Sequence, residues 1–548
     1  MTAGAPARLA AHTVAAVLSG RSGPGGPFDP AELARLDEAE EFPAAACAEL
    51  DAAGLPDWYV PARFGGALAE LPDVMAVMRA TARRDLTVAI AHGKTFLGSV
   101  SVWVAGSADQ AAALASAVRS GGIVSWGLTE RDHGSDLMAG AVTATRHGDG
   151  WVLDGAKWLI NNATRADLMC VLARTEPGGG PRGFSVFLAD LRDPRPGTVR
   201  RTPKLRTHGI RGADISGVEF TGAAAVLVGD EGAGIEITLK ALQLTRTTCT
   251  VLSLGAGDHA VAIAAEFLRE RVLGRRRLSD VPRMRRVLGE AATGVLLAEA
   301  AAVVAARSAH TLPDELSVTS ALVKAFVPTA VEQSIEQLAE LMGTRGFLTA
   351  DYRHGEFAKL ERDHRIVGLF DGSTLVNRAS LITQFPRLAR RNALDVTTTV
   401  CLAEPLPTLD TARLVLVSRT GNAIVSGLSS ALAELPAEFA DLADALLRES
   451  GAVHAELARH RPVARAVPTA AFRLAERYEL LFAAAAAVHV WVANPASRWE
   501  RGCWLRACLT LALTRLGVPV DGADDAYEDV AAAVLAHGAV SLLDGGRA

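Results

Sequence analysis

The order of hydrophobic and polar residues divides the chain into helical and extended regions. From Pro30 to about Ser120, and again from Ile235 to about Leu394, apolar residues recur at helical spacing. Between them the pattern changes to short apolar runs bounded by Gly, Pro, Asp or Asn, which is typical of strands. These runs are 151–153, 168–172, 184–188 and 217–220. The pattern predicts a small β-barrel or sandwich between two helical domains.

The remaining segments lie at the two ends of the chain. Gly, Pro and Ser dominate residues 19–27, which predicts a flexible leader. After residue 396 the helical texture returns, with apolar faces over 409–435, 437–459 and 468–492. The expected domains are therefore a leader (1–28), an N-terminal helical domain (29–121), a β-domain (122–230), a helical bundle (231–395) and an additional C-terminal helical domain (396–548).

Composition narrows the class of protein. The 548 residues are 49% hydrophobic and 21% charged, with a net charge of −5, so nucleic acid is not an expected partner. Six scattered cysteines without a C-x-x-C pair argue against a zinc ribbon or a disulfide framework and fit a reducing cytoplasm, and no metal ligands are expected. The N-terminus lacks the apolar run of a signal peptide. The apolar stretch 480–493 is too short to span a bilayer, so no membrane association is expected.

Three motifs carry the chemistry. They are Leu128–Asp136 (LTERDHGSD), Lys157–Asn162 (KWLINN) and Phe370–Ser373 (FDGS). Further landmarks lie N-terminal to them, at 42–43, 54–55, 64–66 and 106–110. The order and spacing of these segments resemble the acyl-CoA dehydrogenase and oxidase superfamily of flavoenzymes over about residues 30–395. The resemblance implies a mainly α fold with a central β-domain, and an enzyme that binds FAD.

The resemblance also implies roles for single residues. Asp371 would be the catalytic base that removes the α-proton of an acyl thioester, with Arg246 as a pocket residue that orients it. The β-hydride would pass to flavin N5. The residues implied to bind the cofactor are Leu128, Thr129, Ser135, Leu159, Asn161, Arg271, Leu273, Glu340, Gly343 and Ser373.

Several of these positions depart from the family pattern. Relatives usually carry glutamate at the position of Asp371, and many have tryptophan and threonine where this chain has Leu159 and Asn161. Asn161 is expected to donate through its amide, as a threonine hydroxyl would. At Leu159, either Trp158 compensates for the lost indole or the flavin face is more open. Glu270 and Glu340 replace a family arginine and glutamine, which predicts weaker retention of FAD.

Three interpretations of Asp371 stay open. It is the base in a re-shaped pocket, or it serves a different reaction, or it is a turn residue in an impaired homologue. The expected activity is an FAD-dependent dehydrogenase of acyl-CoA or acyl-carrier-protein thioesters. The alternatives are an oxygen-using member (acyl-CoA oxidase, nitroalkane-oxidase-like enzyme or flavin monooxygenase) and a non-catalytic flavin-binding homologue. Expected electron acceptors are an electron-transfer flavoprotein or O₂, and the expected assembly is a homodimer or homotetramer.

Overall fold

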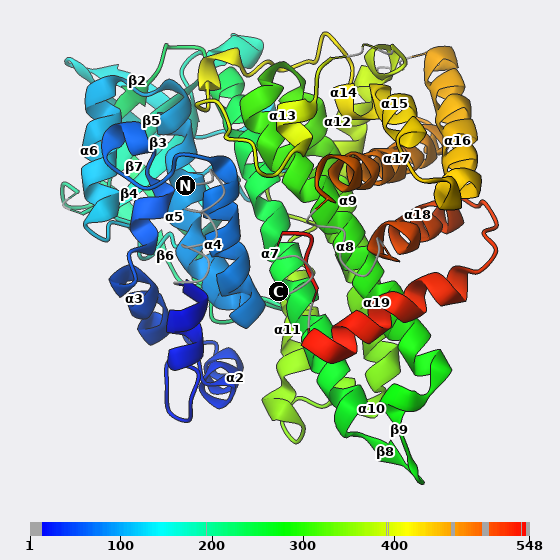
Figure 1. Cartoon of the computed structure of the whole chain (residues 1–548). Helices are drawn as coiled ribbons and strands as arrows, with labels where there is room; N and C mark the ends of the chain where they lie inside the picture. Colours follow the sequence, from blue (N-terminus) through cyan, green and yellow to red (C-terminus); the bar gives the residue numbers. More distant parts are fainter. Residues whose placement is uncertain are drawn as a thin grey trace.

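The three expected layers of the fold follow one another along the chain, and a fourth packs onto them (Figure 1). The computed structural model describes residues 14–192, 194–390, 392, 394–461, 466–495, 503–538 and 540–543. The first layer is helical. It consists of α2 (Pro30–Ala39), α3 (Ala44–Ala52), η1 (Leu55–Tyr59), η2 (Ala62–Phe64), α4 (Leu71–Arg84), α5 (Leu86–Ala105) and α6 (Ala108–Arg119).

Side-chain caps set where the N-terminal helices begin. Asp85 stands just before α5 and accepts a hydrogen bond from the backbone N–H of Val88 at 2.9 Å. Ser107 and Gln110 form a reciprocal capping box at the start of α6. Such caps satisfy backbone donors that have no partner within the helix.

The β-domain is a sheet that closes on itself. Its strands are β1 (Val124–Gly127), β2 (Thr143–His147), β3 (Gly150–Asn161), β4 (Leu168–Arg174), β5 (Phe184–Asp190), β6 (Val199–Thr202) and β7 (Ile215–Val228), with short turns η3 (Leu137–Ala139) and η4 (Gly180–Gly183). Closure follows because β5 pairs with both β4 and β7, while β2 pairs with both β3 and β4. The predicted barrel-like domain is therefore confirmed, and all four predicted strand runs lie within β3, β4, β5 and β7.

The bundle is built from long apolar helices. Its elements are α7 (Gly234–Glu270), β8 (Val272–Leu273), β9 (Arg276–Arg277), η5 (Leu278–Asp280), α8 (Pro282–Thr311), η6 (Pro313–Glu315), α9 (Leu316–Met342), α10 (Thr344–Phe347), η7 (Arg353–Gly355), α11 (Glu356–His364) and α12 (Thr374–Leu388). By length and composition alone, α5, α7 and α8 could cross a membrane. In this structure, most of each apolar window is buried inside the molecule.

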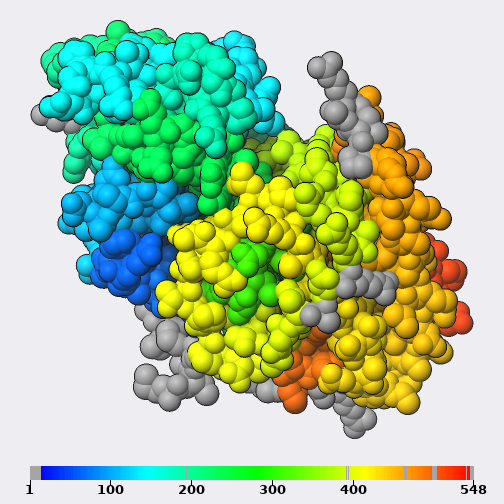
Figure 2. Space-filling view, turned by 90° about the horizontal axis from the view of Figure 1, so that it is seen from above, coloured from blue at the N-terminus to red at the C-terminus, as the bar shows by residue number. Residues whose placement is uncertain are grey.

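The C-terminal extension is an integral part of the molecule. It contains α13 (Thr397–Val400), η8 (Thr411–Arg413), α14 (Ala423–Ser426), α15 (Leu428–Ala433), η9 (Ala437–Phe439), α16 (Ala440–Arg459), α17 (Thr469–Ala493), α18 (Cys503–Arg515) and α19 (Ala523–His537). Helices α17, α18 and α19 all pack against α8. Seen from above, the β-domain (cyan) lies at the end of the molecule opposite α16 (orange), while the first part of the extension (yellow) lies between them (Figure 2).

Buried polar groups anchor this extension to the bundle. The guanidinium of Arg307 on α8 donates to the carbonyl groups of residues 398, 399, 401 and 404. The fully buried carboxylate of Glu299, also on α8, accepts from the hydroxyl of Ser541 and the backbone N–H of Leu542. Because a buried polar group without a partner is costly, these contacts fix where the extension sits.

The helical texture expected over 409–435 forms three short helices, η8, α14 and α15, with turns at Ser418–Gly421 and Gly427. The described part of the expected leader is anchored at both of its ends. Val14, Leu18 and Phe28 are buried in one apolar cluster with residues of α2 and α3. Residues 1–13 of that leader lie outside the described residues.

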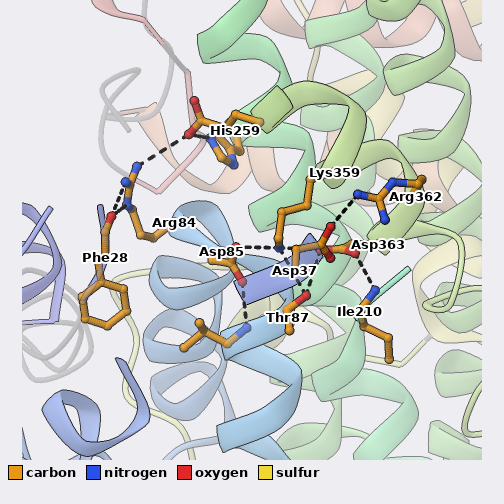
Figure 3. A network of polar contacts seen from close by, with 12 residues as sticks. Phe28, Asp37, Arg84, Asp85, Thr87, Ile210, His259, Lys359, Arg362 and Asp363 are labelled. Carbon is orange, nitrogen blue, oxygen red and sulfur yellow. Dashed lines mark hydrogen bonds and ion pairs between the residues drawn. The ribbon is translucent and has the colours of Figure 1, made fainter. Parts of the chain in front are cut away.

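A buried lysine joins the three domains (Figure 3). The ammonium group of Lys359 on α11 lies 2.7 Å from a carboxylate oxygen of Asp85 and 2.7 Å from one of Asp363. Asp363 also accepts from the backbone N–H of Ile210, which belongs to the β-domain. Burial alone would lower the pKa of Lys359, but Asp363 and Asp85 outweigh it and raise that pKa. One charged cluster thus connects the N-terminal domain, the β-domain and the bundle.

Replacing Lys359 with methionine should strongly destabilise the protein. The change leaves two buried carboxylates without their cation, so we expect the free energy of unfolding to fall by about 3–5 kcal/mol. Denaturant unfolding measures this loss. The matched control is Lys240→Met, which removes an ion pair with Glu236 one turn away on α7 and should change stability by less than about 0.5 kcal/mol. Equal effects of the two substitutions would contradict the role of Lys359.

The free energy of unfolding should depend on pH because of Glu356. Burial alone would raise its pKa, but His259, Arg353 and Arg84 outweigh it and lower that pKa to about 2. Because the folded pKa lies below the unfolded value, the carboxylate stabilises the fold above about pH 4.5. This stabilisation is lost as the pH falls towards 2. Urea unfolding measured at about pH 6 and about pH 3.5 gives the free energy of unfolding at each pH. Between these two pH values, this free energy should fall less in Glu356→Gln than in the parent protein. Equal losses would refute the assignment.

Candidate active site

A buried ion pair holds the loop after β1 in place. The ammonium group of Lys157 on β3 lies 2.7 Å from a carboxylate oxygen of Glu130 and donates to the carbonyl of Leu128 at 3.1 Å. The Glu130 carboxylate also accepts from the backbone N–H groups of Ala141 and Val142. Burial acts to raise the pKa of Glu130, but Lys157 and the backbone donors outweigh it and lower the pKa. The charged pair therefore fixes both ends of the loop that carries Thr129 and Ser135.

A bulge in β3 determines which side chain faces outward. Leu159 has a left-handed backbone conformation with φ 57°, and the pairing register with β7 shifts between Trp158 and Ile160. The Leu159 side chain is consequently 43% exposed. Trp158 is half-buried beneath the guanidinium of Arg131, at 5.0 Å from the ring centroid. The position of the family tryptophan therefore presents a leucine outward, while Trp158 packs against the β1 loop.

The Asn161 amide is placed differently from the expectation. Its Nδ2 donates to the carbonyl of Ile90 on α5 at 3.1 Å, while its Oδ1 is buried and has no hydrogen-bond partner in the described chain. The indole Nε1 of Trp158 is likewise buried without a partner. The unsatisfied atom of Asn161 is thus an acceptor, whereas we expected its amide to donate. Buried polar atoms without partners are found at sites where a bound group completes the hydrogen bonding.

Asp371 lies in a tight turn between α11 and α12. Its backbone is left-handed with φ 53°, and Gly372 follows with φ 90°. A side chain at residue 372 would be strained at that φ and would meet the Arg246 guanidinium at 3.0 Å. The glycine is therefore required by both backbone angle and space.

Two buried cations hold the backbone of this turn. The Nε of Arg246 on α7 donates to the carbonyl of Asp371 at 3.0 Å. The ammonium group of Lys324 on α9, which is fully buried, donates to the carbonyls of Val367 at 2.7 Å and Gly372 at 3.3 Å. Burial lowers the pKa of Arg246 to about 10 and that of Lys324 to about 8, with Asp371 opposing the shift in each case.

Cys249 completes the surroundings of the carboxylate. Its sulfur lies 3.6 Å from Oδ2 of Asp371, and its side chain is fully buried on α7. Burial, followed by the charge of Asp371, raises the pKa of this thiol well above its ordinary value. The turn thus presents one carboxylate beside a thiol, and two buried cations hold its backbone.

Apart from Ser373, the other predicted site residues fall into two groups. Leu128 and Thr129 are half-buried and Ser135 is exposed, all in the loop after β1. Ser373 caps α12, because its Oγ accepts from the backbone N–H of Val376 at 3.3 Å. The second group, Arg271, Leu273, Glu340 and Gly343, lies at the far end of the bundle, by β8, β9 and α10 (Figure 1). Along α7, this end is roughly 36 Å from Arg246, at 1.5 Å per residue.

Sequence reasoning missed three residues of the site. Cys249 and Lys324 contact the Asp371 turn, and Lys157 anchors the β1 loop. For Lys324 a signal exists, because it is a single cation within the apolar run Val318–Val327. A lysine in such a run is buried in the bundle and requires polar partners there. Cys249 gives no comparable signal, because a buried thiol is common in apolar helices.

Comparison with protein-family models identifies the chain. Residues 30–122, 125–223 and 232–384 match the N-terminal, middle and C-terminal domains of acyl-CoA dehydrogenase. Together they cover most of the chain and follow the family's order. The protein belongs to the acyl-CoA dehydrogenase family, whose members bind FAD, and it is an oxidoreductase that acts on CH–CH groups.

Curated relatives match over the same region. The chain is 27% identical over 349 residues to the probable acyl-CoA dehydrogenase FadE25 of Mycobacterium tuberculosis, covering 63% of this chain and 88% of that protein. It is 26% identical over 357 residues to the human mitochondrial short-chain specific acyl-CoA dehydrogenase, covering 63% of this chain and 83% of that one. Both matches cover too little of this chain to include all of the extension.

Solved structures show the same fold. An acyl-CoA dehydrogenase of Bacillus anthracis in complex with FAD superposes with a TM-score of 0.74 at 18% identity, covering 97% of this chain and 94% of that one. A glutaryl-coenzyme A dehydrogenase with bound glutaryl-CoA superposes with a TM-score of 0.62 at 21% identity, covering 68% and 93%. The fold with extra C-terminal helices is therefore shared with the first of these structures.

Proposed function

We propose that this protein is an FAD-dependent dehydrogenase of acyl-CoA thioesters in which Asp371 is the catalytic base. The observation that carries the proposal is the Asp371 turn, where one carboxylate stands beside Cys249 and two buried cations hold the backbone. A positioned carboxylate is the group required to remove a weakly acidic proton next to a thioester carbonyl. The family to which the chain belongs acts on such thioesters.

The residues near Asn161 fit a bound flavin. The buried Oδ1 of Asn161 and the indole N–H of Trp158 have no partners in the described chain, and Leu159 projects outward beside them. A flavin ring offers polar edges and apolar faces that complement such a surface. Asn161, Leu159 and the loop of Leu128 and Thr129 would hold it. When bound, FAD would accept the hydride that leaves the β-carbon.

The protein's own groups then have separate tasks. Asp371 takes the α-proton and becomes a carboxylic acid. Arg246 and Lys324 keep the turn in place by donating to its carbonyl groups, and their positive charge offsets the charge of the ionised base. Since a base that is misplaced by about 1 Å can lose roughly a hundredfold in rate, this rigid turn matters for catalysis.

Cofactor binding is expected to require a second copy of the chain. Arg271 and Gly343 lie at the far end of the bundle, too distant to contact a flavin held at Asn161 in the same chain. That end also exposes apolar side chains, including Leu273, which is 67% exposed, and Phe347, which is 85% exposed. Helices α17, α18 and α19 already cover part of α8, which favours a dimer over a tetramer.

Asp371→Asn should stop turnover while flavin stays bound. The amide nearly keeps the volume of the side chain but cannot accept the proton, so the rate should fall by about a thousandfold. The measurement is anaerobic bleaching of the flavin by a panel of acyl-CoA thioesters, with Asp351→Asn at an exposed position as the control. Full activity of Asp371→Asn would exclude it as base. Rapid reoxidation of the reduced flavin by O₂ would instead identify an oxidase, and activity restricted to carrier-protein thioesters would correct the substrate class.

Charges at the far end of the bundle should separate the subunits. Light scattering of the parent protein should give the mass of two chains. Leu273→Glu combined with Phe347→Glu should give single chains that have lost FAD but keep their helical circular dichroism, because burying two carboxylates in an interface is unfavourable. The control is Leu447→Glu on α16, which is 43% exposed on the extension. A single-chain parent protein that retains FAD would contradict shared binding.

A further inference from the structure

The backbone of the Asp371 turn is held by three side chains, which restricts how far it can adjust the reach of its carboxylate. Arg246 and Lys324 hold the carbonyls of residues 371 and 372 from two helices, and the side chain of Asn377 donates to the carbonyl of Gly372 at 2.8 Å. With the Cα of residue 371 fixed, only the length and direction of its side chain determine where the carboxylate lies. The position of the carboxylate is therefore set by the residue that it contacts.

That contact is made by Cys249. Arg246 and Cys249 are three residues apart on α7, so they lie on the same face of the helix, towards the turn. Arg246 holds the backbone of Asp371, and Cys249 contacts Oδ2 of the same residue at 3.6 Å. Burial and Asp371 raise the pKa of the thiol, while Lys324 and Lys94 oppose the shift. The sulfur therefore keeps its proton and donates it towards the carboxylate.

The thiol also limits the space beyond the carboxylate. One added methylene would advance the carboxylate by roughly 1.5 Å along its present direction. An oxygen now 3.6 Å from the sulfur would then lie well inside the contact distance of the two atoms. A glutamate at position 371 consequently has to turn away from Cys249 or displace it. Since the core around α7 is closely packed, displacement is unfavourable.

We propose that Cys249 is a positioning residue that orients the Asp371 carboxylate through its S–H group and restricts the base at this site to an aspartate. The inference rests on the proposed role of Asp371 as base. In the proposed reaction the α-C–H bond breaks, its proton goes to a carboxylate oxygen of Asp371, and its electron pair forms the α,β double bond as hydride leaves the β-carbon. FAD, when bound, would supply the hydride acceptor. The S–H bond of Cys249 stays intact throughout.

The two functions of Cys249 can be separated by three substitutions. Cys249→Val removes the donor and slightly enlarges the side chain, Cys249→Ser keeps a donor in a smaller volume, and Cys249→Ala removes both donor and volume. Thr248→Val, on the same helix, is the matched control, because the Thr248 hydroxyl donates only to carbonyls of its own helix. Flavin content and circular dichroism identify any variant that fails to fold.

The first test is the pH profile of anaerobic flavin bleaching. A donor to the ionised carboxylate favours that form, so its loss in Cys249→Val and Cys249→Ala should move the rise of the rate to higher pH. Cys249→Ser should stay close to the parent profile, and Thr248→Val should match it. Unchanged profiles in both Cys249→Val and Cys249→Ala would overturn the role of the thiol as donor.

The second test is a double substitution. Asp371→Glu alone should slow bleaching by about a hundredfold, because the carboxylate is misplaced by about one bond length. Asp371→Glu combined with Cys249→Ala opens the space beyond the carboxylate and should recover at least about tenfold of that loss, although Cys249→Ala alone is slower than the parent. A double variant no faster than Asp371→Glu would overturn the restriction to aspartate. A fully active Asp371→Asn would instead overturn the base assignment itself.

Discussion

The arrangement of the three domains depends on the buried charge of Lys359. Its ammonium group pairs with Asp85 from the N-terminal domain and with Asp363 from α11. Asp363 also accepts a hydrogen bond from the backbone N–H of Ile210 in the β-domain (Figure 3). A charge in the interior is tolerated only when its partners are in place. The cluster can therefore form only when all three domains are docked, so α11 is fixed relative to both the sheet and the first helices.

The position of α11 also determines where the Asp371 turn lies, because the turn follows this helix along the chain. The turn is then tied to α7 by Arg246 and to α9 by Lys324, while the β1 loop is tied to β3 by the Glu130–Lys157 pair. Buried ion pairs and charged hydrogen bonds, in addition to apolar packing, thus hold the Asp371 turn and the loop after β1 in place. Such contacts are directional, which apolar contacts are not.

Much of the fold could be predicted from the sequence, and less of the site. Helical periodicity and short apolar runs predicted the order of helical and β regions, and the motifs around Thr129, Asn161 and Asp371 identified the family. The division of 409–435 into short helices could not be predicted, because its apolar spacing continues across turns that tertiary packing imposes. The orientation of the Asn161 amide depends on Ile90, and the contact of Cys249 with Asp371 joins two distant helices. Spacing along a chain carries no information on such pairs.

The central claim is that cleavage of the substrate α-C–H bond by Asp371 is part of the step that reduces the flavin. The most direct measurement is anaerobic single-turnover bleaching with thioesters that carry deuterium either at the α-carbon or at the β-carbon. The account predicts slower bleaching with the α-deuterated thioester than with the unlabelled one. Equal rates for those two substrates, with slowing only by β-deuterium, would contradict it, because hydride loss would then proceed without a base at the α-carbon.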